Sequence, residues 1–94
     1  MLSETELDEL VHRTVALYNR FHSPEAIAKI VTVTPYIVRI SFTGSFCYSC
    51  GVLDYLEDFV HEFELFTDKV RLKIDKTHQV DPRTFEADYK VKYR

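Results

Sequence analysis

The spacing of the apolar residues changes along the chain from a helical period to a strand period, and this change limits the possible folds. In residues 3–21 and 52–66 the apolar residues recur three and four positions apart, which predicts two amphipathic helices. In residues 70–75 and 85–93 they alternate with mostly charged residues, which predicts two strands with one buried face. A chain that mixes these elements folds as packed layers around one core.

Residues 28–42 add a β-hairpin to this pattern. They contain two runs rich in β-branched residues, separated by Thr34-Pro35-Tyr36, a sequence typical of a turn. The resulting order is α-β-β-α-β-β, and a length of 94 residues suits a single domain, residues 1–94. We expect an α+β two-layer sandwich in which both helices pack on one face of a small mixed sheet.

Each helix has a predicted buried stripe. Ser3 and Glu6 have the spacing of a capping box, in which each side chain accepts a hydrogen bond from the other residue's backbone N–H. The acidic residues of the second helix are expected to form a solvated face opposite its stripe. The stripe of the first helix comprises Leu7, Leu10, Val11, Thr14, Val15, Tyr18 and Phe21, and that of the second Val52, Tyr55, Leu56, Phe59, Val60 and Phe63.

Charge is distributed unevenly. The net charge is −3, but residues 1–68 hold 11 Asp and Glu against four Lys and Arg, whereas residues 69–94 hold eight Lys and Arg against four Asp and Glu. An acidic chain argues against nucleic acid as a partner, because neutralising phosphates supplies most of that affinity. We interpret the basic part as a solvated strand face, with an acidic partner or the acidic half of a second copy as the alternative. Tyr89 and Tyr93 are expected in the core rather than stacked on bases.

The composition also bears on location. No apolar run approaches the roughly 18–20 residues that a membrane helix needs, and the first residues lack the order of a secretion signal. We therefore expect a soluble cytoplasmic protein without a membrane partner. Two Cys in such a chain argue against a disulfide framework.

The two cysteines form a C-x-x-C motif at Cys47 and Cys50, just before the second helix. A helix amino end favours the thiolate, which is the form that binds metal. Two thiolates are half of a tetrahedral set, so either a His completes it or two chains contribute two Cys each. We expect ordinary surface or helix-end roles for His12, His22, His61 and His78, and His22 is the first of them to check.

The stretch from Ile30 to Cys50, with Thr43-Gly44-Ser45-Phe46 leading into the cysteine pair, resembles the NifU carboxy-terminal domain over about residues 3–75. The resemblance implies a non-enzymatic iron–sulfur scaffold or carrier. It implies a cluster bridged between subunits by Cys47 and Cys50, with Gly44 as the loop glycine of the cofactor site. A homo-oligomer and apo-protein recipients of the cluster would be its partners.

Other functions remain open at this point. Zinc could replace the cluster at the same two cysteines. A dithiol redox protein that cycles Cys47 and Cys50 is the enzyme-class alternative. A structural oligomerisation domain with buried thiols is the third possibility. The chain contains no phosphate-binding glycine motif and no metalloprotease or hydrolase motif, so an enzyme is not the favoured interpretation.

Overall fold

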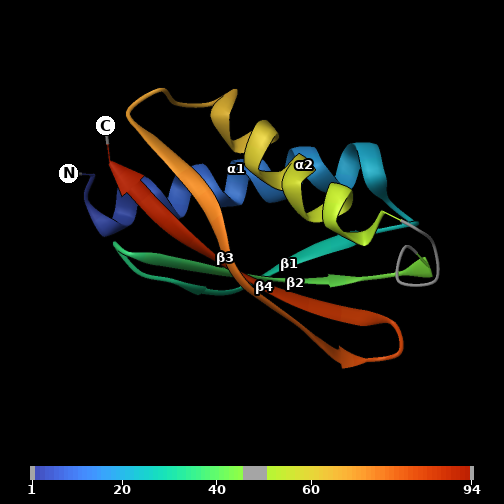
Figure 1. The fold of residues 1–94 in the computed structure, drawn as a ribbon. Coiled ribbons are helices and arrows are strands. Elements are labelled where there is room, and N and C mark those ends of the chain that lie inside the picture. Colours follow the sequence, from blue (N-terminus) through green and yellow to red (C-terminus); the bar gives the residue numbers. More distant parts are fainter. Residues whose placement is uncertain (1, 46–50, 94) are drawn as a thin grey trace.

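The computed structural model describes residues 2–45 and 51–93, and these form a layer of helices packed on a layer of strands (Figure 1). The order of the elements confirms the predicted α-β-β-α-β-β arrangement and the α+β class, and both helices lie on the same side of the sheet (Figure 1). The elements are α1 (Glu4–His22), β1 (Ile27–Val33), β2 (Ile37–Thr43), α2 (Val52–Glu64), β3 (Val70–Asp81) and β4 (Thr84–Tyr93).

The sheet has the strand order β1-β2-β4-β3, and all its neighbouring strands are antiparallel. The prediction of a mixed sheet is therefore wrong. β3 turns directly into β4 as a hairpin, and β4 lies between β3 and β2. β2 and β3, which precede and follow α2 in the sequence, do run in the same direction. They form no parallel pair because β4 lies between them in the sheet.

β3 is longer than its sequence pattern predicted, because it continues past residue 75 to Asp81. Most of the predicted loop is thus strand, and only Pro82 and Arg83 connect β3 to β4. The register shifts between Ile74 and Lys76, so the alternation of faces is interrupted there. All residues after this shift are exposed, and because they cover no core they carry no apolar period.

The core lies between the helices and the inner face of the sheet, and four buried rings meet in it. The ring of Phe42 on β2 lies 5.3 Å from that of Tyr18 on α1 and 5.9 Å from that of Phe59 on α2. Phe59 stacks on Tyr89 of β4 with 5.4 Å between ring centroids. The predicted burial of Tyr89 is confirmed, and its hydroxyl donates a 2.7 Å hydrogen bond to the Leu56 carbonyl.

α1 begins as its capping signal predicts, with one difference. The Ser3 hydroxyl oxygen accepts a 3.1 Å hydrogen bond from the Glu6 backbone N–H, but the Glu6 carboxylate accepts from the Ser3 hydroxyl instead of from the backbone. The prediction that Phe21 is buried is wrong, since its side chain is 69% exposed. In the last turn Tyr18 and His22 occupy the face that meets α2, and Phe21 lies about 100° around the helix from His22.

Among residues 2–45 and 51–93, no helix is both long enough and apolar enough to cross a membrane.

Candidate functional site

Gly44, the predicted cofactor-site glycine, lies immediately after β2 and contacts two distant segments. Its φ of 146° lies in the region that favours glycine, and a Cβ at this position would overlap the Glu25 carbonyl. Its N–H donates a 3.0 Å hydrogen bond to the Arg83 carbonyl. Close backbone approach therefore explains a glycine here. The predicted ligands Cys47 and Cys50 lie outside the described residues.

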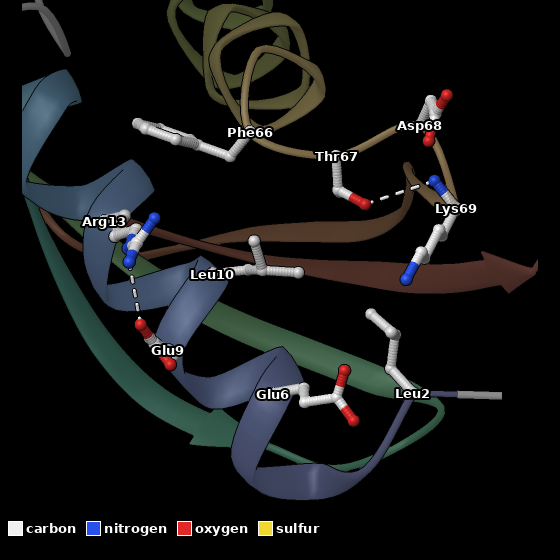
Figure 2. A pocket seen from close by; sticks show the side chains of 9 residues that line it. All are labelled: Leu2, Glu6, Glu9, Leu10, Arg13, Phe66, Thr67, Asp68 and Lys69. Atoms are coloured by element: carbon white, nitrogen blue, oxygen red, sulfur yellow. Dashed lines mark hydrogen bonds and ion pairs between the residues drawn. The ribbon is translucent and has the colours of Figure 1, made fainter.

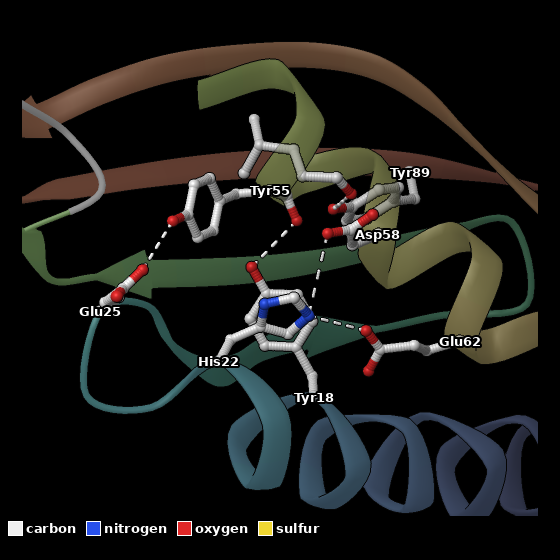
Figure 3. Close-up of polar contacts among 8 residues, drawn as sticks. Tyr18, His22, Glu25, Tyr55, Asp58, Glu62 and Tyr89 are labelled. Atoms are coloured by element: carbon white, nitrogen blue, oxygen red, sulfur yellow. Dashed lines mark hydrogen bonds and ion pairs between the residues drawn. The ribbon is translucent and has the colours of Figure 1, made fainter. Parts of the chain in front are cut away.

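The end of α1 is joined to α2 by a cluster of polar side chains that centres on His22 (Figure 3). The His22 Nε2 atom lies 2.8 Å from Glu62 Oε2 and 3.9 Å from Asp58 Oδ2. The side chains of His22 and Glu62 are only 17% and 15% exposed, so water screens their interaction weakly. His22 thus lies at the end of α1, as expected, but its side chain is shielded between two helices and does not lie at the surface.

Two tyrosines extend this cluster away from Glu62 (Figure 3). The ring of Tyr18 stacks on His22 with 4.1 Å between centroids, and its hydroxyl donates a 2.9 Å hydrogen bond to the Tyr55 carbonyl. Burial, and then the charges of Asp58 and Glu62, raise the pKa of Tyr18 well above its usual range. The Tyr55 hydroxyl in turn donates a 2.8 Å hydrogen bond to Glu25, and this bond raises the pKa of Tyr55.

Glu62 corrects the prediction that the acidic residues of the second helix form a solvated face. Its Oε2 atom contacts His22, and its Oε1 atom is buried without a hydrogen-bond partner among the described residues. The side chain lies at the contact with α1 because α2 packs beside that helix (Figure 3). The geometry makes the His22–Glu62 pair a polar clamp between two helices, which is a structural role.

The other three histidines have the ordinary surroundings that the sequence predicts. Each is more than half exposed at its side chain and lies within 4.0 Å of one nearby carboxylate: His12 near Asp8, His61 near Glu64 and His78 near Glu86. Among the residues that the structure describes, no group of three or more His, Cys, Asp or Glu is arranged to hold a metal ion.

A groove of about 330 Å³ lies beside the first half of α1, where the connection from α2 to β3 passes (Figure 2). Leu10 and Phe66 contribute apolar surface to it, and Arg13 on its rim is paired with Glu9 at 2.9 Å. The rim holds charges of both signs, so it does not select a ligand by charge. Its lining residues are Leu2, Glu6, Glu9, Leu10, Arg13, Phe66, Thr67, Asp68 and Lys69.

The face of the sheet that is turned away from the helices has an excess of cations. The strand registers and the exposure pattern place seven Lys and Arg but only three Asp and Glu on it. We call this surface the basic sheet face. Its cations are Lys29, Arg39, Arg71, Lys73, Lys76, Lys90 and Lys92, and its acids are Asp75, Glu86 and Asp88.

Two pairs of cations stand directly opposite each other on this face. The register of β3 and β4 aligns Arg71 with Lys92 and Lys73 with Lys90. Like charges in directly opposed positions destabilise a sheet. The charge of Lys90 is partly neutralised by Asp75, whose Oδ1 atom lies 3.6 Å from the Lys90 Nζ atom. Arg71, Lys73 and Lys92 have no ion-pair partner among residues 2–45 and 51–93.

A neighbouring part of the basic sheet face is neutralised. Arg39 on β2 donates two hydrogen bonds, of 2.6 and 3.0 Å, to the carboxylate of Asp88 on β4. The guanidinium of Arg39 holds the pKa of Asp88 below its usual value. The unpaired positive charge is therefore concentrated on the β3 side of the sheet.

A second groove, of about 310 Å³, runs between α2 and β3. Its apolar lining comes from Val60 on α2 and from Leu72 and Ile74 on β3. Glu57 and Glu64 of α2 line one wall, and four consecutive residues of β3 line the other. The complete lining is Glu57, Val60, His61, Glu64, Arg71, Leu72, Lys73 and Ile74.

Comparisons with known proteins correct the sequence-based identification. No family model matches the chain, and no curated protein matches it. A solved structure described as "Probing the function of heme distortion in the H-NOX family" is similar, with a TM-score of 0.47 and 10% sequence identity. The match covers 96% of this chain and 46% of the other, so this chain spans about half the length of the solved structure.

The predicted resemblance to the NifU carboxy-terminal domain is therefore wrong, because no family model, that of NifU included, matches the chain. The predicted iron–sulfur scaffold function and its place in iron–sulfur cluster assembly are wrong with it, because they rested on that resemblance and the described residues hold no metal site. The described residues give no support to an iron–sulfur cluster or to zinc. A single motif, the spacing of Cys47 and Cys50 after Gly44, had carried that identification.

Proposed function

We propose that this chain is a non-enzymatic interaction module that binds an acidic segment of a partner protein through the basic sheet face. One observation carries the proposal: Arg71 and Lys92 oppose each other across two strands, and neither forms an ion pair with another of residues 2–45 and 51–93. Such a pair is unfavourable in the free protein and becomes favourable when a carboxylate approaches both cations.

The opposite layer of the molecule supports this assignment. α2 holds five acidic residues and no Lys or Arg, and α1 holds four acidic residues against two Arg. An acidic partner is thus repelled by the helices and attracted by the sheet, which orients its approach. The five acidic residues of α2 are Asp54, Glu57, Asp58, Glu62 and Glu64.

The chemistry of the face favours an acidic protein segment over nucleic acid. Glu86, Asp88 and Asp75 lie among the cations and would repel a continuous phosphate backbone. The described strand residues of this face include no Phe, Tyr or Trp on which bases could stack, and the ring of His78 lies 3.5 Å from the Glu86 carboxylate. Spaced carboxylates can contact the unpaired cations of β3 and β4 individually.

The test uses a fluorescent Glu-rich peptide and the full chain, with fluorescence anisotropy as the readout. The double variant Arg71→Gln/Lys92→Gln is expected to weaken binding roughly tenfold, which corresponds to about 1.4 kcal/mol. Raising the salt from about 0.02 M to about 0.2 M should weaken the parent's binding more than the variant's, because salt screens exposed charges. Arg20→Gln, which removes an exposed cation from α1, is the matched control and should leave binding unchanged.

Three results would contradict the proposal. Equal binding by the parent and the double variant would show that the opposed cations are not the site. Tighter binding of a single-stranded RNA of matched charge would assign the face to nucleic acid. Self-association in sedimentation runs that the double variant abolishes would assign it to a second copy of the chain.

A further inference from the structure

The edge of the sheet beside the basic sheet face has features of a strand-binding site. β3 is an edge strand, so one side of its backbone has no neighbouring strand in the described sheet. On the β3 side, the α2–β3 groove is lined by four consecutive residues, from Arg71 to Ile74. Side chains alternate between the two faces of a strand, so a groove lined by consecutive residues borders the backbone edge itself.

The two faces of this edge differ in chemistry. On the groove side, Leu72 and Ile74 offer apolar surface together with Val60 of α2. On the opposite side, Arg71 and Lys73 are exposed cations. A strand added beside β3 would therefore place every second side chain against apolar surface and the alternate side chains near cations.

The acidic residues of α2 restrict which side chains fit the groove. Glu57 and Glu64 line its helical wall together with His61, and the three lie on one side of the helix at spacings of four and three. Carboxylates of an incoming strand are disfavoured on that side by like charge. They are favoured on the outer side, near Arg71 and Lys73.

A second copy of β3 fits this edge poorly. Its outer positions hold the cations Arg71, Lys73 and Lys76 against one acid, Asp75, which is already paired with Lys90, so a second copy would bring an excess of positive charge against the first. Exposed cations on an edge strand are a known protection against self-pairing. The edge thus disfavours its own sequence and favours an acidic one.

We propose that the free edge of β3 accepts an extended segment of the partner as an added strand, with acidic and apolar side chains in alternation. This inference rests on the proposed function, since it specifies the conformation and pattern of the same acidic partner. Backbone hydrogen bonds to β3 supply part of the affinity, and the alternation determines which segment binds.

The experiment compares short labelled peptides of identical composition on the full chain at constant salt. Glu-Val-Glu-Val-Glu-Val-Glu is expected to bind about tenfold or more tightly than Glu-Glu-Glu-Glu-Val-Val-Val, because only the first presents its two residue types on opposite faces. N-methylation of the alternating peptide at all Glu or at all Val blocks one backbone edge or the other. One methylated peptide should lose about tenfold or more in affinity and the other less than about threefold. Bound peptide should also slow amide exchange in residues 70–76.

The outcomes separate this inference from the proposed function. If the alternating, block and both methylated peptides bind equally well and remain sensitive to Arg71→Gln/Lys92→Gln, the added strand is refuted and the acidic docking face stands. If none of the acidic peptides binds, both proposals fail. Preferential binding of Lys-Val-Lys-Val-Lys-Val-Lys would overturn the charge assignment of both.

Discussion

The His22–Glu62 clamp and the opposed cations of the basic sheet face differ in both the sign and the exposure of their charges. In the clamp, groups that can carry opposite charges meet at 2.8 Å with little exposure to water. On the sheet, Arg71 and Lys92 carry the same charge and remain exposed in facing positions. Removing one member of a largely shielded pair leaves the other without its partner, whereas exposed like charges add nothing to the fold and remain available for a partner. The difference separates the structural polar cluster from the candidate binding surface.

The largest expected effect comes from breaking the clamp. His22→Ala removes the partner of the partly buried Glu62 carboxylate and the ring that stacks on Tyr18. We expect a loss of about 2 kcal/mol in the free energy of unfolding, because a largely shielded polar group without its partner is unfavourable. Urea unfolding followed by circular dichroism measures this difference.

His12→Ala is the matched control for that variant. His12 lies on the same helix, also near a carboxylate, but its side chain is 63% exposed. An exposed pair of this kind contributes little, so the control should stay within about 0.5 kcal/mol of the parent. Similar losses in the two variants would mean that burial does not distinguish the clamp from a surface pair.

An intermediate effect is expected at high pH from the buried tyrosines. Burial raises the pKa of Tyr89 in the folded state, while in the unfolded chain it titrates near its ordinary value of about 10. Above that pH the unfolded state loses a proton that the folded state keeps, so stability falls as pH rises, by up to about 1.4 kcal/mol per pH unit for each such tyrosine.

Tyr89→Phe tests this assignment. The variant lacks the hydrogen bond to the Leu56 carbonyl and should be about 1 kcal/mol less stable at neutral pH. Above about pH 10 the variant should also lose stability less steeply than the parent, because of the two buried tyrosines Tyr18 and Tyr89 only Tyr18 is left to titrate. An unchanged alkaline slope in urea titrations at several pH values would contradict the buried titration.

The smallest effect is expected on the sheet and has the opposite sign. Arg71→Gln/Lys92→Gln removes a like-charge contact, so the variant should equal the parent in stability or exceed it by a few tenths of a kcal/mol. The same variant is expected to bind the acidic peptide more weakly. A clear loss of stability in thermal unfolding would mean that the cations support the fold. It would contradict the claim that only the clamp, and not the opposed cations, stabilises the protein.

Much of the fold was accessible from local sequence patterns. The Ser3 cap, the helical stripes apart from Phe21, and the strands that begin at Val70 and near Phe85 were predicted because their signals lie within a few residues. The pairing of strands was not, since nothing local indicates that β4 enters between β2 and β3. The mixed sheet was the resulting error. The extension of β3 was missed because its last residues have no apolar face.

The candidate sites show the same division. His22 stood out in the sequence, but its partner Glu62 lies 40 positions further along the chain, where spacing gave no indication of contact. The basic character of the last strands was visible as composition, and was interpreted as a solvated face. The opposition of Arg71 and Lys92 depends on the hairpin register, which the sequence pattern alone does not determine. The metal interpretation of the C-x-x-C motif rested on its spacing, on its place before a helix and on the glycine loop that precedes it, and none of these determines which fold or partner the cysteines have.

The interior position of β4 has a consequence for the order of folding during synthesis. Because β4 is the last strand in the chain and pairs on both sides, the β1–β2 hairpin and β3 cannot be joined into one sheet until it has been made. Its pairing with β3 is local, whereas its pairing with β2 links residues more than 40 positions apart. Pairing of β4 with β2 therefore costs the larger loop-closure entropy, and we expect it to limit the folding rate of the domain.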